Sequence, residues 1–236
     1  MKNSNYNLVF EDFDNSFRTL ITLLDNEGTI VNSTNNNLSV KDQYKSCIKE
    51  LNFVFYTIKD PTKVLLSSKI FRQKPLWTIS ELISEMAVIN PPLMNKYLPE
   101  LQKKFYDLDF MERQRYLYGS RFLEFDQLQH TFTKLKNNPN SKKALMMIYT
   151  PYDTHPDIKD VPCNILSNYI IRDDALHSTI YIRSQDIAAG MLYDTVLHSF
   201  FQQCMASWLN VKIGQLNIFC NSLHYYPDTD GPKLND

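Results

Sequence analysis

The sequence predicts an α+β fold, and three of its features support this prediction. Apolar residues recur at helical spacing between residues 12 and 25 and again after residue 194. Alternating runs rich in β-branched and aromatic side chains, typical of strands, cover residues 51–58, 165–171 and 176–182. The 236-residue chain is 43% hydrophobic and 13% aromatic, which is enough to bury a sizeable core. We expect one domain, residues 1–236, without internal repeats.

Composition and charge exclude several classes of protein. The formal net charge of −1 offers no basic surface to a nucleic-acid partner. No apolar run reaches transmembrane length, and the N-terminus lacks the apolar segment of a signal peptide. We therefore expect a soluble, cytoplasmic protein that does not enter membranes. The four cysteines have no CxxC spacing and the five histidines are scattered, so we expect free thiols and no metal site.

The N-terminal half of the chain is predicted to contain two helices and a strand. The first helix covers Asp12 to Asp25, where apolar residues lie on one face. The strand covers Leu51 to Ile58 and ends at Asp60-Pro61. The second helix covers Trp77 to Ile89 and stops at the Asn-Pro-Pro sequence that follows it.

The C-terminal half is predicted to be richer in strands. Two alternating runs flank Asp173-Asp174, a turn sequence, so together they form a hairpin. A strongly apolar core helix opens at Asp194. The remaining predicted elements are a helix over Phe125 to Leu135, strands over Ala144 to Tyr149 and Leu216 to Cys220, and a turn at Lys212 to Gly214.

The candidate catalytic residues lie around this hairpin. Pro162-Cys163 precedes its first strand, and Arg183 follows its second. Because a hairpin returns the chain beside its start, a thiol and a guanidinium are expected to lie near one another. An Arg close to a Cys lowers the thiol pKa and can hold an anion beside a nucleophile.

The spacing of these residues resembles the thymidylate synthase family, and more closely its deoxycytidylate hydroxymethylase branch. The shared pattern is Pro162-Cys163, then Arg183-Ser184-Gln185-Asp186 after the family's twenty-residue interval, then Gly190 and Asp194. The resemblance implies a thymidylate synthase-like fold, with a mixed sheet packed with helices and a symmetric homodimer formed through the sheet. It also implies a one-carbon transferase that uses 5,10-methylenetetrahydrofolate and a pyrimidine nucleoside monophosphate.

The same resemblance assigns roles to further residues. Cys163 is the nucleophile that adds to C6 of the pyrimidine, because a covalent adduct divides one difficult step into easier ones. Glu81 organises proton transfers, with Glu85, one helical turn on, as the alternative; either is also consistent with a solvated helix residue. Tyr118 joins the proton network. Nucleotide and folate contacts are assigned to Arg183, Ser184, Asp186, Asn168, Gly190, His224 and Tyr226, and to Lys142 and Lys143 of the partner subunit.

Several features depart from the family pattern. The polar segment from Asn32 to Asn37 has no Arg or Lys where the family carries a phosphate-binding Arg. Lys142 and Lys143 stand where many members have an Arg pair, and Lys cannot make bidentate contacts. The chain ends ten residues after Tyr226, from which we expect an open folate site and a hydroxymethyl product.

Asp194 is predicted to determine whether cytosine or uracil binds in the site. The synthases have Asn here, which can donate to O4 of uracil and accept from its N3–H, whereas a carboxylate can only accept. A carboxylate suits the N4 amino group of cytosine and can hold a proton shared with N3. The alternative is that Asp194 merely caps the helix that follows. Three functions remain open: a cytidylate hydroxymethylase, a thymidylate synthase, and a catalytically weak member kept for nucleotide binding.

Overall fold

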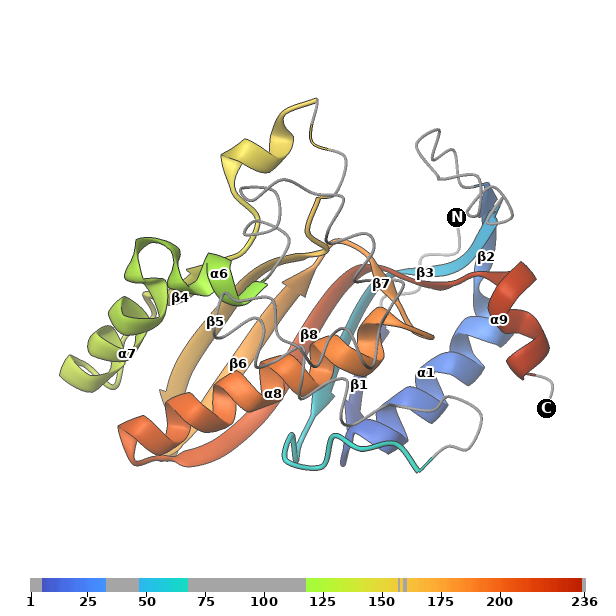
Figure 1. Cartoon of the computed structure of the whole chain (residues 1–236). Coiled ribbons are helices and arrows are strands. Elements are labelled where there is room, and N and C mark those ends of the chain that lie inside the picture. The colour runs from blue at the N-terminus through green and yellow to red at the C-terminus, as the bar shows by residue number, and fades with distance from the viewer. Residues whose placement is uncertain (1–5, 33–46, 68–117, 157, 159–160, 235–236) are drawn as a thin grey trace, which may run out of the picture.

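The computed structural model, shown in Figure 1, describes residues 6–32, 47–67, 118–156, 158 and 161–234. Its strands are β1 (Tyr6–Phe10), β2 (Thr29–Asn32), β3 (Cys47–Ile58), β4 (Ala144–Met147), β5 (Asn164–Arg172), β6 (Ala175–Ile182), β7 (Gln185–Asp186) and β8 (Lys212–Tyr225). Its helices are α1 (Phe13–Glu27), α6 (Tyr118–Leu123), α7 (Gln127–Asn137), α8 (Gly190–Leu209) and α9 (Pro227–Leu234), with 3-10 turns η1 (Glu124–Asp126) and η2 (Pro151–Thr154). The predicted helix over residues 77–89 lies outside the described residues.

The strands form one mixed sheet in the order β1-β3-β8-β6-β5-β4, with β2 paired to β3 and β7 paired to β8. The β1–β3 and β6–β8 pairs are parallel, and the β3–β8, β5–β6 and β4–β5 pairs are antiparallel. This arrangement confirms the predicted α+β class and the mixed sheet packed with helices.

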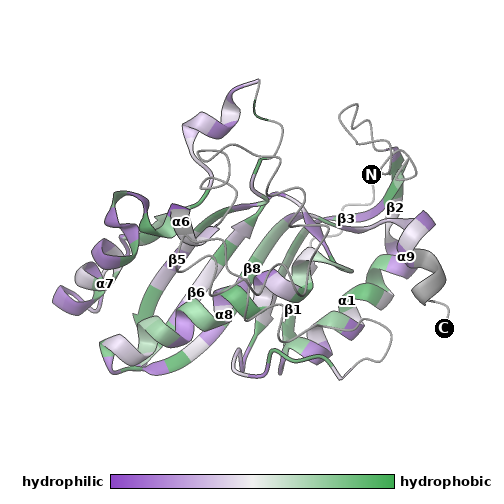
Figure 2. Cartoon of the chain, viewed as in Figure 1, coloured by the Kyte–Doolittle hydropathy of each residue, from purple (hydrophilic) through white to green (hydrophobic). Residues whose placement is uncertain are grey.

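Helix α1 forms because its sequence caps one end and buries one face. The Asp12 side chain accepts a hydrogen bond from the backbone N–H of Asn15 at 2.9 Å, which satisfies an otherwise free donor of the first turn. Phe13, Phe17, Leu20 and Leu24 recur at helical spacing and are all buried. Figure 2 shows apolar residues recurring between polar ones along α1. The predicted first helix is therefore confirmed.

The hairpin that carries the candidate site is also confirmed. Strands β5 and β6 pair from Asn164↔Ile182 to Arg172↔Ala175. The two turn residues, Asp173 and Asp174, have φ angles of 50° and 63°. Two successive left-handed residues match the right-handed twist of the flanking strands, and Asp tolerates this conformation better than most residues.

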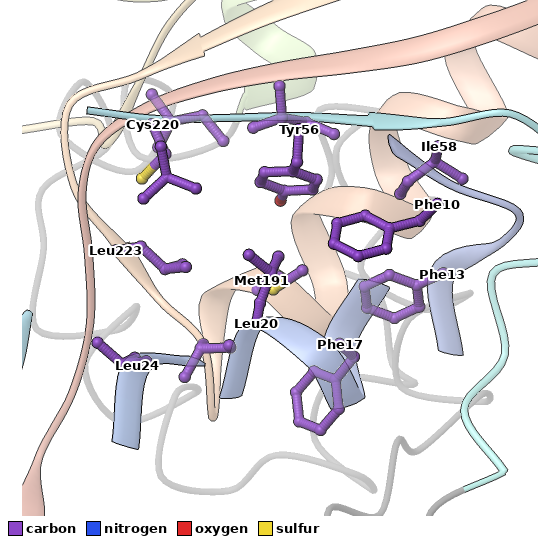
Figure 3. Packing of buried hydrophobic residues seen from close by; sticks show 14 of the residues in the cluster. Phe10, Phe13, Phe17, Leu20, Leu24, Tyr56, Ile58, Met191, Cys220 and Leu223 are labelled. Atoms are coloured by element: carbon purple, nitrogen blue, oxygen red, sulfur yellow. The ribbon is translucent and has the colours of Figure 1, made fainter. Parts of the chain in front are cut away.

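Helices α1 and α8 both cover the same face of the sheet (Figure 1). Figure 3 shows Met191 of α8 beside the sheet residues Tyr56 and Leu223 and the α1 residue Leu20. A second core cluster lies further along α8, where Phe201 contacts Phe122 edge-on with ring centroids 4.7 Å apart. These two clusters fix α8, and with it the candidate site, against the sheet.

The opposite face of the sheet carries a row of large apolar residues. The register aligns Met147, Leu166, Tyr181, Phe219 and Phe55 across five strands. Met147 is 42% exposed and Tyr181 is 40% exposed. No helix in the described part of the chain covers this row.

Three predicted boundaries are wrong. Helix α8 begins at Gly190, so Asp194 lies in its second turn and is not its N-cap, which is Ala189. Helix α7 begins at Gln127, because Phe125 and Asp126 have left-handed φ angles of 56° and 52° that interrupt the helix. Lys212 to Gly214 is no turn: Lys212 pairs with Ala175 of β6, which makes it part of β8. The chain instead reverses at the left-handed residue Asn210. Within the described ranges, none of the helices combines the length and the apolar character that a membrane span requires.

Candidate active site

Cys163 and Arg183 lie next to each other, as the predicted hairpin requires. The backbone N–H of Arg183 donates to the Cys163 carbonyl at 2.9 Å. The guanidinium donates from Nε to the Pro162 carbonyl at 2.9 Å and from Nη2 to the Val161 carbonyl at 2.7 Å. The side chain of Arg183 thus clamps the backbone that leads directly into Cys163.

The carboxyl of Asp194 projects from the second turn of α8 toward the start of that helix. A Cβ atom placed on Gly190 would lie 3.6 Å from its Oδ2. Burial raises the pKa of Asp194 to about 7, because taking a carboxylate out of water disfavours its charged form. The side chains of Asn164 and Gln185 oppose this shift by stabilising the charge. Near neutral pH this carboxyl can therefore either donate or accept a hydrogen bond.

A layer of uncharged polar groups lies beneath Asp194. The Tyr56 hydroxyl donates to Oε1 of Gln185 at 3.1 Å. Burial raises the pKa of Tyr56 well above its usual value and also raises that of the Cys220 thiol, and in both cases the nearby Asp194 charge adds to the effect. Both groups therefore stay neutral when Asp194 titrates.

The end of β8 brings a second group of predicted residues close to the first. His224 pairs with Asp186 of β7, and its carbonyl accepts from the backbone N–H of Ile187 at 2.8 Å. The His224 ring is 5.5 Å from the Tyr226 ring, nearly perpendicular to it. Oδ1 of Asp186 accepts from the Ala188 backbone N–H at 2.9 Å, so this carboxylate braces the segment that leads into α8.

Comparison with known proteins identifies the family in which this arrangement of residues occurs. The family model described as "Thymidylate synthase" matches residues 41–229 of the chain. The chain belongs to the thymidylate synthase family. The match includes both the Cys163–Arg183 clamp and His224.

Individual relatives of the family are similar to this chain over shorter stretches. A deoxyuridylate hydroxymethyltransferase of Bacillus phage SP01 is 31% identical over 140 residues, which is 56% of this chain and 37% of that protein. A protein named "Putative thymidylate synthase" from Methanothermobacter thermautotrophicus is 27% identical over 202 residues, 79% of this chain and 90% of its own. One of the same name from Methanococcoides burtonii is 28% identical over 171 residues, 66% and 77% of the two chains. Family and relatives together indicate a one-carbon transferase acting on pyrimidine nucleotides.

Not every residue assigned from the family resemblance joins this cluster. Asn168 lies between Leu145 and Thr179 in the register, on the sheet face opposite α8, because its neighbour Tyr169 is buried in the core on the α8 side. Tyr118 packs against the second core cluster. Glu81 and Glu85 lie outside the described residues.

The remaining assigned residues sit at the edges of the site. Ser184 lies between β6 and β7, directly after the Arg183 clamp. Lys142 and Lys143 are exposed and precede β4, at the edge of the sheet. No group of His, Cys, Asp and Glu within the described ranges could hold a metal ion.

Sequence reasoning missed four polar residues that surround Asp194: Asn164, Gln185, Tyr56 and His198. All four are buried, and Asn164 Oδ1 lies 3.0 Å from His198 Nε2. Two of them carried a usable signal, because Asn164 adjoins Cys163 and Gln185 lies inside the Arg-Ser-x-Asp motif. His198 and Tyr56 carried none, since each occupies an ordinary core position of its helix or strand.

Proposed function

We propose that this protein is a pyrimidine nucleotide C5 hydroxymethyltransferase that acts on a cytidylate, CMP or dCMP, in the cytoplasm. Methylenetetrahydrofolate supplies the one-carbon unit at the oxidation level of formaldehyde. The net reaction joins the nucleotide, methylenetetrahydrofolate and water to give the 5-hydroxymethyl nucleotide and tetrahydrofolate. The observation that carries the proposal is the carboxyl of Asp194, withdrawn from water and with a raised pKa, close to the Cys163–Arg183 clamp.

The chemistry of cytosine suits a carboxyl whose pKa is close to neutrality. A protonated Asp194 donates to N3 of cytosine and accepts from its N4 amino group. Sharing that proton with N3 draws electrons out of the ring and makes C6 more susceptible to attack. The raised pKa of Asp194, about 7, keeps the proton available at physiological pH.

Cys163 acts as the nucleophile. Its thiolate adds to C6, which gives C5 the electrons it needs to form the new carbon–carbon bond. Loss of the C5 proton then releases tetrahydrofolate from the new methylene group, water adds to that methylene, and departure of the Cys163 sulfur restores the ring. Arg183 stabilises the thiolate and fixes the loop that presents it, through its bonds to the Pro162 and Val161 carbonyls.

Phosphate, sugar and folate contacts hold the base over Cys163. The Nη1 group of Arg183 makes no hydrogen bond to the described residues, so it can bind phosphate together with Ser184. His224 and Tyr226 bind the sugar. Asp186 suits a pterin ring, because a carboxylate accepts hydrogen bonds from ring N–H groups. Binding energy from these remote groups serves to position the reacting carbon.

The active enzyme is a symmetric homodimer formed through the open face of the sheet. The apolar row that includes Met147 and Tyr181 favours burial against a second copy, since soluble monomers rarely expose large apolar patches. Lys143 precedes β4 in phase with the exposed residues Leu145 and Met147, so the Lys142-Lys143 pair lies beside this face. From there the pair reaches the nucleotide phosphate of the partner.

A uridylate is the second candidate substrate. The phage relative is named a deoxyuridylate hydroxymethyltransferase. A protonated Asp194 also fits uracil, because it can donate to O4 and accept from N3–H. The proton transfer that cytosine needs for activation is what favours the cytidylate.

The substitution Asp194→Asn separates the two candidates. Asn can pair with either base but has no acidic proton to share with N3 of cytosine. We expect the ratio of kcat/KM for cytidylate to that for uridylate to fall at least about tenfold, since sites built around such hydrogen bonds discriminate strongly. Asp174→Asn, in the exposed hairpin turn, is the matched control. An unchanged ratio in Asp194→Asn contradicts the role in base selection.

A further inference from the structure

The side chain of Asn164, the residue after the proposed nucleophile, is fully buried, but only one of its two polar atoms has a hydrogen-bond partner. It begins β5 and is 0% exposed. Its Oδ1 lies 3.0 Å from Nε2 of His198. Its Nδ2 completes no hydrogen bond to the described residues. Buried polar groups in native proteins nearly always have a partner, so an unpaired amide nitrogen beside a reaction centre points to a role there.

His198 determines which way this amide points. Burial lowers the pKa of His198 to about 3, so the imidazole is neutral and carries a single N–H. With the hydrogen on Nε2, His198 donates to Oδ1 of Asn164 and leaves the Nδ2 group to face Asp194. The reversed amide would set an oxygen against an ionised Asp194 carboxylate, acceptor against acceptor.

The fold places the three side chains together. Asp194 and His198 are four residues apart on α8, so they lie on the same face of the helix, one turn from each other. Asn164 reaches both from the adjoining strand, since it bonds to His198 and stabilises the charged form of Asp194. Gln185 stabilises the same charge while its own oxygen accepts from Tyr56.

We infer that Asn164 and His198 form a positioning pair for Asp194: His198 holds the amide of Asn164, and the amide N–H of Asn164 orients the Asp194 carboxyl toward the base. The identity of the base rests on the proposed function, but the pair itself does not. Asn164 already stabilises the charged form of Asp194 without nucleotide, and its Nδ2 group can tighten onto the carboxyl when a base binds. Neither residue contacts the reacting atoms, so both act through Asp194.

The other titratable groups around Asp194 do not reproduce this effect. Tyr56 faces it from β3 and Cys220 from β8, and burial raises the pKa of each. His198 itself stays neutral. Cys163 precedes Asn164 in the chain, and the carboxyl ¹³C signal used below reports directly on Asp194 and not on the thiol.

The direct test is the titration of Asp194 itself, followed by carboxyl ¹³C NMR in the protein without nucleotide. Loss of an N–H donor destabilises the charged form, so Asn164→Ala should raise the Asp194 pKa by about half a unit or more. His198→Ala, which leaves β5 intact, should raise it in the same direction because the freed amide can reverse. His198→Gln, whose amide can still donate to Asn164, should restore most of the wild-type value.

Kinetics give the second readout. For the preferred nucleotide, Asn164→Ala and His198→Ala should lower kcat/KM by about tenfold or more and move the alkaline limb of its pH profile upward. Ser178→Ala is the matched control, because it removes a buried 2.8 Å hydrogen bond between β6 and Gln202 of α8, away from Asp194.

The outcomes separate this inference from the proposed function. An Asp194 pKa that is the same in wild type, Asn164→Ala and His198→Ala overturns the positioning pair, whatever the substrate is. So does a shift of equal size in Ser178→Ala. If Asp194 titrates as expected but the enzyme prefers uridylate, the pair stands and the choice of cytidylate falls.

Discussion

Replacing Asp194 with Asn should stabilise the fold, and the gain should depend on pH. The pKa of this carboxyl is about 7 in the folded protein, against an ordinary value of 3.8. A folded pKa above the unfolded one means that the folded state keeps the proton longer. The carboxyl therefore costs nothing below about pH 4 and becomes progressively destabilising as the pH rises to about 7. The variant Asp194→Asn lacks this penalty at every pH.

The size of the stability difference between Asp194→Asn and wild type follows from the shift in pKa. Each unit corresponds to about 1.4 kcal/mol, so a shift of about three units sets an upper limit of about 4 kcal/mol. Asp194 is only partly buried as a residue, so water screens part of this cost. We expect Asp194→Asn to be more stable than wild type by about 1–3 kcal/mol at neutral and alkaline pH. Function thus retains a carboxyl that the fold would be more stable without.

Urea unfolding at about pH 5 and about pH 8 measures this difference in the free energy of unfolding. The difference between Asp194→Asn and wild type should be clearly larger at the higher pH. Asp174→Asn, at an exposed left-handed turn position that Asn also tolerates, shows what loss of a solvated carboxylate does in this chain. A stability difference that is constant between the two pH values, or a variant less stable than wild type at the higher pH, would mean that burial does not destabilise the charged form of Asp194.

Two further predictions follow from the proposed chemistry. Cys163→Ala should abolish turnover and the release of tritium from C5 of labelled nucleotide while the melting temperature stays close to that of wild type; a residual activity of about a tenth would exclude covalent catalysis. A Cys163→Ala subunit and a subunit with Lys142→Ala and Lys143→Ala should each be nearly inactive alone but recover activity when mixed, because one hybrid site then has both the thiol and the lysines; a monomer by light scattering would contradict this.

The fold was predictable where local patterns and long-range packing agree. The first helix has both a capping Asp and an apolar face, and the hairpin has both alternation and an Asp-Asp turn, so both appear as expected. The start of α8 could not be placed, because Gly190 is a poor helix residue and the N-cap, Ala189, makes no side-chain capping bond. Likewise, the interruption before α7 depends on two left-handed residues, Phe125 and Asp126, for which the sequence gives no local reason.

The candidate site was predictable only in part, for a physical reason. Cys163, Arg183 and Asp194 were found because they match a spaced pattern that resembles a family. The groups that tune Asp194 come from β3, β5, β7 and α8, and the environment that raises its pKa exists only once those elements pack. A lone core histidine such as His198 has no sequence signature, because its hydrogen bond to Asn164 joins residues 34 positions apart.

If the proposed function is correct, this chain transfers a one-carbon unit to C5 of a cytidylate through Cys163. Incubation of the purified protein with CMP, dCMP and dUMP in turn, each with methylenetetrahydrofolate, followed by mass spectrometry of the nucleotides, tests it most directly. We expect a 5-hydroxymethyl product, formed fastest from a cytidylate, with tetrahydrofolate as the second product. A methyl product from dUMP with dihydrofolate formed one-for-one, or no modified nucleotide from any of the three, would contradict it.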